Sequence, residues 1–145
     1  MNKNTMVSVI IPSYNHEKFI EKCILSILNQ SFTDFELLIA DDCSTDSSRE
    51  KIQGIKDSRI TSYFFEENVG TVQTLNFLIS KCKGKYIAII GSDDLWEKDK
   101  LKLQVEFMES NINYGACFTW ANIIDDDDIP YIENDSINND IFCEE

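Results

Sequence analysis

Two adjacent carboxylates, Asp93 and Asp94, follow a short apolar run and could bind a cation. The run, residues 86–90, is rich in β-branched and aromatic residues and predicts a strand buried on both faces of a parallel sheet. Gly91 ends the run, which places both acids at the carboxyl end of a central strand, where open α/β sheets bind ligands. Adjacent carboxylates repel each other unless a cation or a donor lies between them. The pair is therefore either a divalent metal site that holds a diphosphate or a polar turn that caps the next helix.

Two further predicted strands end in polar side chains. Residues 12–15, Pro-Ser-Tyr-Asn, close a β-branched run over 6–11, and Asp41 and Asp42 close an apolar run over 35–40. In a parallel sheet all three strand ends lie along one edge. At such an edge a tyrosine can stack on a flat base, while a neighbouring carboxylate accepts the ring N–H of that base. This convergence favours the ligand-binding interpretation of the acidic pair.

The sequence lacks the glycine-rich loops of two large nucleotide-binding classes. Neither GxGxxG after the first predicted strand nor GxxxxGK[ST] anywhere is present. This disfavours dinucleotide oxidoreductases and P-loop NTPases. A nucleotide held by a base pocket and a metal suggests instead an enzyme that acts on a sugar nucleotide.

Strand and helix patterns alternate along the chain. This order predicts an α/β fold with a mostly parallel sheet covered on both sides, in one domain over residues 1–145. Asn15 is expected to cap the first helix at its N-terminus, and Gly84 to cap the third at its C-terminus. The expected strands are 6–11, 35–40, 59–65, 86–90 and 114–124, and the expected helices are 16–29, 47–55, 72–82 and 99–110.

Composition excludes several classes of partner. The formal net charge of −13 argues against nucleic acid and against docking on an anionic membrane. The five cysteines form no CxxC pair, and Cys23, Cys82 and Cys117 fall on apolar positions, as small core residues do. With neither a signal peptide nor a transmembrane run, a cytoplasmic location without membrane insertion is expected.

Several segments, in order and at matching spacing over about residues 6–124, make the chain resemble family 2 glycosyltransferases of the GT-A fold. The resemblance implies an α/β, Rossmann-like nucleotide-sugar-binding part, with the acceptor-side part of the domain missing from residues 1–145. The matching segments are VSVIIPSYN (7–15), ILNQSF (27–32), FELLIADDCSTD (35–46), NVG (68–70) with Asn76, GKYI (84–87), and DDLW (93–96) with KL (100–101).

The resemblance also implies roles at the nucleotide. Pro12 and Tyr14 would line the base pocket, with Tyr14 on a uracil-like ring, and Asp42 would accept the base N3–H. Asn15 and Asn76 are further candidate nucleotide-binding residues.

At the diphosphate, the resemblance assigns Asp93 to the ribose or diphosphate side and Asp94 to Mn²⁺ or Mg²⁺, as the last acid of a DxD-type motif. Two positions depart from the family pattern. Gly91 stands where the family often has Asp, and Leu75 stands where it often has Arg, which removes a possible phosphate partner.

The implied reaction is transfer of a sugar from a nucleotide-diphosphate sugar, most simply a UDP-sugar, to an acceptor hydroxyl with inversion. The acceptor would be a carbohydrate or glycolipid in polysaccharide assembly, with the full protein in the cytoplasm or at the inner face of the membrane. The catalytic base is expected beyond Glu145. Two alternatives are a nucleotide-sugar-binding module without turnover and a nucleotidyltransferase that acts on a sugar phosphate.

Other polar or aromatic residues have simpler interpretations. The run 125–128, four aspartates, predicts a solvated turn, and Asp46 a helix cap. His16 is expected at the surface close to the pocket, and Trp96 is expected to pack behind the metal loop. Asp41 is equally consistent with a loop cap and with a ligand.

Overall fold

A computed structural model of the protein describes residues 5–130 and 141–144. The chain forms two compact units, Met1–Lys100 and Leu101–Glu145. The first unit contains the predicted parallel sheet and all the candidate site residues.

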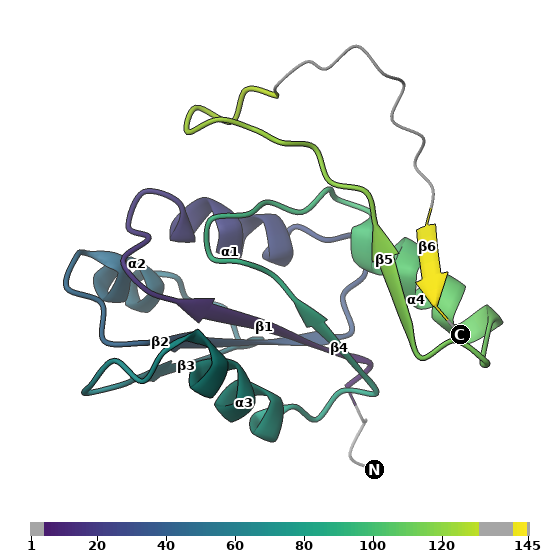
Figure 1. Cartoon of the computed structure of the whole chain (residues 1–145), viewed down its shortest axis with the longest axis horizontal. Helices are drawn as coiled ribbons and strands as arrows, with labels where there is room; N and C mark the ends of the chain where they lie inside the picture. The colour runs from purple at the N-terminus through teal and green to yellow at the C-terminus, as the bar shows by residue number, and fades with distance from the viewer. Residues whose placement is uncertain (1–4, 131–140, 145) are drawn as a thin grey trace. The chain divides into compact units, whose positions relative to one another are not determined.

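The first unit is built on four parallel strands, in the order β3-β2-β1-β4. This arrangement confirms the predicted α/β fold with a parallel sheet (Figure 1). The strands are β1 (Val7–Ser13), β2 (Phe35–Asp41), β3 (Ile60–Phe64) and β4 (Tyr86–Ile89).

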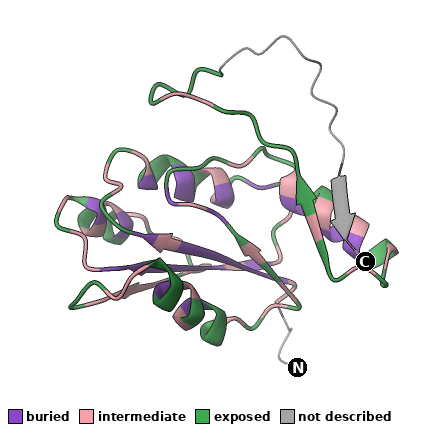
Figure 2. Cartoon of the chain, viewed as in Figure 1, coloured by how far each residue is buried: buried purple, intermediate pink, exposed green. Residues whose placement is uncertain are grey.

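Helices cover both faces of this sheet. Helix α1 (Ile20–Leu28) and α3 (Thr71–Lys81) lie on opposite faces, and α2 (Ser48–Gly54) is a neighbour of α1 (Figure 1). The two central strands are buried almost throughout (Figure 2). On the α3 side the core comprises Ile10, Leu38, Ala40 and Leu78. The buried stripe of α1 consists of Ile20, Cys23, Ile24 and Ile27.

The strand that precedes the acidic pair, β4, was predicted to be central. It is instead an edge strand of the described sheet. Within the described residues β4 pairs with β1 alone, and Ile87 and Ile89 are 45% and 55% exposed. An apolar run shows that a segment is strand-like but does not show how many neighbours it has. The prediction that this strand is buried on both faces was therefore wrong.

The first helix begins at Ile20 rather than at residue 16, and Asn15 is not its N-cap. Asn15 has a φ of 53°, which turns the chain sharply after β1. Its side-chain oxygen instead accepts hydrogen bonds from the backbone N–H and hydroxyl of Thr45, at 2.8 and 3.3 Å. A distant loop thus takes the oxygen that a local cap would have used.

Gly84 is required for a close approach of two segments, not as the predicted helix cap. Helix α3 already ends before Cys82, whose backbone is extended. A Cβ on Gly84 would lie 2.4 Å from the backbone nitrogen of Ser8 and 2.7 Å from the carbonyl carbon of Val7. Since both atoms belong to the backbone of a buried strand, they cannot move aside cheaply.

Replacing Gly84 by alanine should lower the free energy of unfolding by about 3 kcal/mol, because the added methyl overlaps β1. Urea denaturation followed by circular dichroism measures the change. Gly54→Ala is the matched control, because a Cβ there meets no atom within 4 Å. Equal stabilities for the Gly84 and Gly54 variants would contradict the close approach.

An ion pair at the start of β3 makes stability depend on pH. The Arg59 guanidinium donates to both Asp57 oxygens and lowers the pKa of Asp57 from 3.8 to about 2. Arg59 also stacks over the Phe35 ring, 4.7 Å from its centroid. A carboxyl whose pKa is lower in the folded than in the unfolded state stabilises the fold at pH values above its unfolded-state pKa. This stabilisation is lost as the pH falls through the folded-state pKa.

The free energy of unfolding at pH 6 should therefore be about 1 kcal/mol higher for wild type than for Asp57→Asn. The difference is small because solvent screens this partly exposed pair. The difference should shrink between about pH 4 and pH 2 as Asp57 is protonated. Urea midpoints of both proteins across this range measure it. A difference that stays constant down to pH 2 would show that the charge of Asp57 is not responsible.

The second unit contains a shorter final strand than the sequence predicted. Helix α4 (Lys100–Ser110) buries Leu101, Val105 and Met108, as its pattern predicted. The strand expected over 114–124 is only β5 (Ala116–Thr119), and it pairs antiparallel with β6 (Ile141–Glu144) rather than joining the parallel sheet. Strands β5 and β6 form a separate sheet, so the prediction of a long fifth strand in the mostly parallel sheet was wrong.

Three smaller predictions can also be compared with the structure. The four-aspartate run forms an exposed turn closed by Asp125, whose carboxylate accepts from the backbone of Asp127 and Ile129, as predicted. Cys23 is buried as predicted, whereas Cys82 and Cys117 are only half-buried. Over the described part of the chain, none of the helices has the length and apolar character needed to cross a membrane.

Candidate functional site

The ends of β1, β2 and β4 meet at one edge of the sheet, as the sequence predicted. Ser13 is the register partner of Asp41, and Ile10 is the partner of Ile89. The backbone N–H of Asp42 donates to the carbonyl of Ser13 at 2.8 Å, which ties two of these ends together directly. The residues that follow the three strands therefore surround a common region.

The base-pocket candidates at the end of β1 differ in exposure. Tyr14 is 45% exposed, so its ring is available to a flat ligand. Pro12 is half-buried and lies within β1, opposite Ala40, so the proline does not stop the strand as expected. Their predicted contacts with a base stay predictions.

Asp42 is almost fully buried and already serves the fold. Its two carboxylate oxygens accept the backbone N–H groups of Val69 and Gly70 at 2.8 and 2.9 Å. The side chain of Asn68 donates to the Asp42 carbonyl at 3.1 Å. A carboxylate has about four lone-pair sites, so these two bonds leave capacity for a base N–H. Asp42 thus holds the turn that precedes α3.

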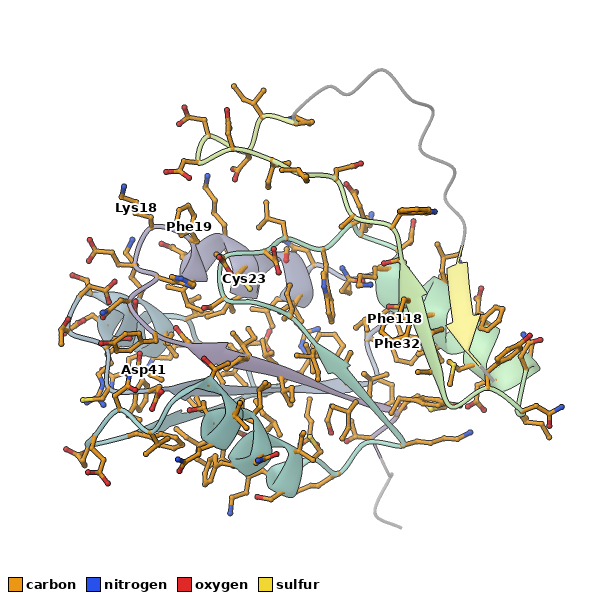
Figure 3. The ribbon with its side chains drawn as sticks, viewed as in Figure 1. Lys18, Phe19, Cys23, Phe32, Asp41 and Phe118 are labelled. Carbon is orange, nitrogen blue, oxygen red and sulfur yellow. The ribbon has the colours of Figure 1, made fainter. Side chains whose placement is uncertain are left out.

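Asp41 is a structural residue, which decides between its two interpretations. It is fully buried, and its Oδ1 accepts from Arg49 Nε at 2.8 Å and from Ser44 N at 3.0 Å (Figure 3). This contact raises the pKa of Arg49. Arg49 also donates to the carbonyl of Phe65, which joins the ends of β2 and β3 through one guanidinium. Asp41 therefore holds the loop after β2.

Asn15 and Asp46 fasten the loops after β1 and β2 to each other. The backbone N–H of Asn15 donates to Ser44 Oγ at 2.9 Å. Asp46 accepts from the backbone of Ser48 at the start of α2 and from that of Glu17 after β1, both at 2.9 Å. Asp46 thus accepts the first backbone N–H of α2, as a cap would, although the N-cap position itself is Ser47. The predicted contact of Asn15 with a nucleotide stays a prediction.

Both acids after β4 are exposed, and Gly91 leaves them room. The Asp94 N–H donates to the Gly91 carbonyl at 3.2 Å in a tight turn. A Cβ at position 91 would lie 2.8 Å from an Asp94 carboxylate oxygen and 2.9 Å from one of Asp93. Burial, followed by the charges of Asp94 and Asp93, raises the pKa of the Cys23 thiol to about 12. Cys23 projects from α1 beneath this turn, with Sγ 3.4 Å from the Gly91 carbonyl (Figure 3).

The acidic turn has the donor set for a cation shared with a substrate. The residues that the structure describes contain no group of three or more His, Cys, Asp or Glu that could hold a metal by themselves. Mg²⁺ and Mn²⁺ commonly use one or two protein carboxylates together with substrate phosphates. Asp94, with Asp93 beside it, fits that arrangement.

His16 and Ser92 belong to the site, although sequence reasoning gave neither a role there. His16 is half-buried, and its Nδ1 lies 2.6 Å from Ser92 Oγ and 3.9 Å from Asp93 Oδ1. His16 was predicted to lie at the surface near the pocket, but its contact with Ser92 was not predicted. The position of His16 directly after the turn that follows β1 was the one sign in the sequence that it could reach the site.

The loop beyond the acids is fixed to the end of α1. Gln30 Nε2 donates to the Glu97 carbonyl at 2.8 Å, and the Trp96 N–H donates to Ser26 Oγ at 3.1 Å. Trp96 is half-buried with Lys100 Nζ 5.4 Å from its ring centroid. These two hydrogen bonds hold the segment that follows the acidic turn against the end of α1.

The two candidates on α3 lie differently. Asn76 is exposed on the helix, and its predicted role near the nucleotide stays a prediction. Leu75 packs against the core cluster beneath α3. The leucine at this position therefore contributes apolar packing.

Comparison with known proteins identifies close likenesses. A model of the family described as glycosyl transferase family 2 matches residues 8–139. A putative teichuronic acid biosynthesis glycosyltransferase of Bacillus subtilis is 40% identical over 131 residues, which cover 89% of this chain and 52% of the relative. An Escherichia coli protein named as a UDP-Glc:α-D-GlcNAc-diphosphoundecaprenol β-1,3-glucosyltransferase is 38% identical over 110 residues, covering 75% of this chain and 44% of that protein. The chain thus spans about half the length of these relatives.

Solved structures show the same fold. TarS of S. aureus, residues 1–349 in complex with UDP, has a TM-score of 0.70 at 29% identity, over 74% of this chain and 33% of that chain. A mannosyltransferase from Pyrobaculum calidifontis, in complex with GDP-Man and Mn²⁺, has a TM-score of 0.64 at 28% identity, over 70% and 32%. These likenesses confirm the predicted GT-A fold.

Proposed function

This chain belongs to glycosyl transferase family 2, and from that premise we propose that it binds a UDP-linked sugar at the edge where β1, β2 and β4 end. The complete protein would transfer the sugar to an acceptor hydroxyl. The observation that carries the proposal is the convergence of Tyr14, Asp42 and two exposed carboxylates on that edge. Family membership favours glycosyl transfer over nucleotidyl transfer.

The base end of the donor is assigned to Tyr14 and Asp42. Tyr14 offers an exposed ring for stacking, and the Asp42 carboxylate, fixed by two backbone N–H groups, offers an oriented acceptor for an N3–H. A uracil carries that N–H. UDP appears in the names of the E. coli relative and of the TarS complex, which supports a UDP-linked donor over a GDP-linked one.

The diphosphate end is assigned to the acidic turn, with Asp94 holding a divalent cation and Asp93 facing the ribose or diphosphate. When bound, the cation would neutralise the charge that develops on the leaving diphosphate. Mn²⁺ in the complex of the Pyrobaculum neighbour supports the choice of metal. An oxygen of each carboxylate lies within 3 Å of where a Cβ at position 91 would stand, so the two acids are close together in this turn.

Transfer is proposed to proceed with inversion. The acceptor oxygen attacks the anomeric carbon from the face opposite the diphosphate, the bond to the diphosphate oxygen breaks, and a base removes the acceptor proton. We assign no base within residues 1–145. We propose that these residues are the nucleotide-sugar-binding part of one family domain whose acceptor side lies in further chain.

The acceptor is proposed to be a carbohydrate or a glycolipid. The E. coli relative is named for a lipid-linked diphosphate sugar, which supports this class. We place the reaction in the cytoplasm, at the inner face of the membrane for a lipid-linked acceptor. A strongly acidic chain is a poor match for nucleic acid.

A nucleotide panel tests the proposed donor. Isothermal titration of the chain with UDP, GDP, ADP and UMP in the presence of Mn²⁺ should show UDP binding tightest, and UMP weaker because it lacks the second phosphate. GDP binding as tight as UDP would refute the uracil assignment. Absence of binding by every nucleotide would refute the site itself.

A further inference from the structure

His16 is held in place by the loop after β2. Its backbone N–H donates to Ser48 Oγ at 3.0 Å, and Ser48 is fully buried at the start of α2. The next residue, Glu17, donates its N–H to Asp46 Oδ2, and its carboxylate accepts from Ser47 N, both at 2.9 Å. The backbone around His16 therefore has little freedom.

The imidazole reaches from this fixed backbone to the turn after β4. Nδ1 lies 2.6 Å from Ser92 Oγ, a short hydrogen bond in which either atom can donate. Ser92 is 2% exposed, so water does not compete freely for its hydroxyl. The ring also meets Phe19 edge to face, with centroids 6.2 Å apart. Ring and hydroxyl thus have one defined arrangement.

Ser92 lies between Gly91 and the two acids, so its position sets theirs. Asp93 and Asp94 are exposed, and neighbouring carboxylates repel each other in the absence of a cation. The hydrogen bond between His16 and the Ser92 hydroxyl therefore links the turn after β4 to the chain that follows β1.

We propose that His16 is a positioning residue for the diphosphate end of the site. Through Ser92 it presents Asp93 and Asp94 in the orientation that a metal-bound diphosphate requires, and it couples that turn to the base pocket after β1. The inference rests on the proposed function. It assigns His16 no proton transfer and no direct contact with the metal.

The test uses His16→Phe, which keeps a ring against Phe19 but removes the nitrogen, and Ser92→Ala, which removes the other partner. UDP affinity is measured by titration with Mn²⁺ and again with a chelator. Loss of one hydrogen bond should weaken binding in Mn²⁺ about fivefold in either variant. The double variant should also lose about fivefold rather than the product of the two losses, because both changes remove the same bond.

Two results separate positioning from a general role in folding. Binding in the chelator should fall less than binding in Mn²⁺, because metal-free binding depends on Asp93 and on the unchanged base pocket but not on the metal at Asp94. His16→Asn should restore Mn²⁺-dependent affinity to within about twofold, since its amide can lie near the position of Nδ1. A merely structural defect would weaken both forms of binding equally and would lower the melting temperature.

Several outcomes would overturn the inference. These are wild-type affinity in His16→Phe, independent losses that multiply in the double variant, and equal losses with and without metal. If wild type itself shows no Mn²⁺-dependent binding, the proposed metal function fails as well. If wild type shows it and His16→Phe matches wild type, only the role of His16 fails.

Discussion

Replacing Asp94 by alanine should remove the Mn²⁺-dependent part of UDP binding and leave metal-free binding nearly unchanged. Asp94 is exposed after β4, and its carboxylate lies beside that of Asp93 over Gly91. Without this ligand, affinity in Mn²⁺ should fall at least about tenfold. In the complete protein the transfer rate should fall about a thousandfold, since metal stabilisation of a leaving diphosphate contributes several kcal/mol.

Two matched variants make this prediction specific. Asp93→Ala removes the neighbouring carboxylate and should weaken UDP binding both with and without Mn²⁺, because Asp93 is assigned to the ribose or diphosphate. Asp126→Ala removes an exposed acid in the four-aspartate turn, which belongs to the second unit, and should change neither. Titration calorimetry measures all three. Undiminished Mn²⁺ dependence in Asp94→Ala would show that another residue holds the metal.

Replacing Asp42 by alanine should have two separable consequences. It leaves the N–H groups of Val69 and Gly70 without their acceptor, which should lower the free energy of unfolding by about 3 kcal/mol. It should also weaken UDP binding about tenfold, because the acceptor for the base N3–H is lost. Urea denaturation measures the first effect, and titration at a temperature where the variant is folded measures the second.

CDP distinguishes base recognition from damage to the fold. Cytosine has no N–H at N3, so wild type should prefer UDP to CDP, and Asp42→Ala should lose that preference. A variant that binds both nucleotides less tightly but keeps the preference would place Asp42 outside the base pocket. Its importance would then be confined to the turn before α3.

The sequence contained the information for the strand ends but not for the neighbours of each strand. Alternating apolar runs and turns placed Tyr14, Asp42 and Asp94 at one edge, because parallel strands share a direction. The same pattern placed β4 in the centre of the sheet, whereas it is an edge strand of the described sheet. It also predicted a long strand over 114–124 in that sheet, whereas the shorter β5 pairs antiparallel with β6 in a separate sheet. A hydrophobic run reports burial tendency and not pairing partner.

Contacts between residues far apart in sequence account for the remaining differences. Asn15 was predicted as a cap because its residue type suits one, but Thr45, 30 residues away, uses its oxygen. The short bond from His16 to Ser92 spans 76 residues and follows no local pattern. Spacing rules describe local structure, so they could place His16 near the site but could not give it a partner.

The most direct test of the central claim is a titration of the wild-type chain with UDP in Mn²⁺ and, in parallel, in a chelator. A nucleotide and a divalent cation should bind together where β1, β2 and β4 end. Binding should be saturable in both conditions, with an affinity at least about tenfold higher in Mn²⁺. Equal affinity in the two conditions, or no binding in either, would contradict it.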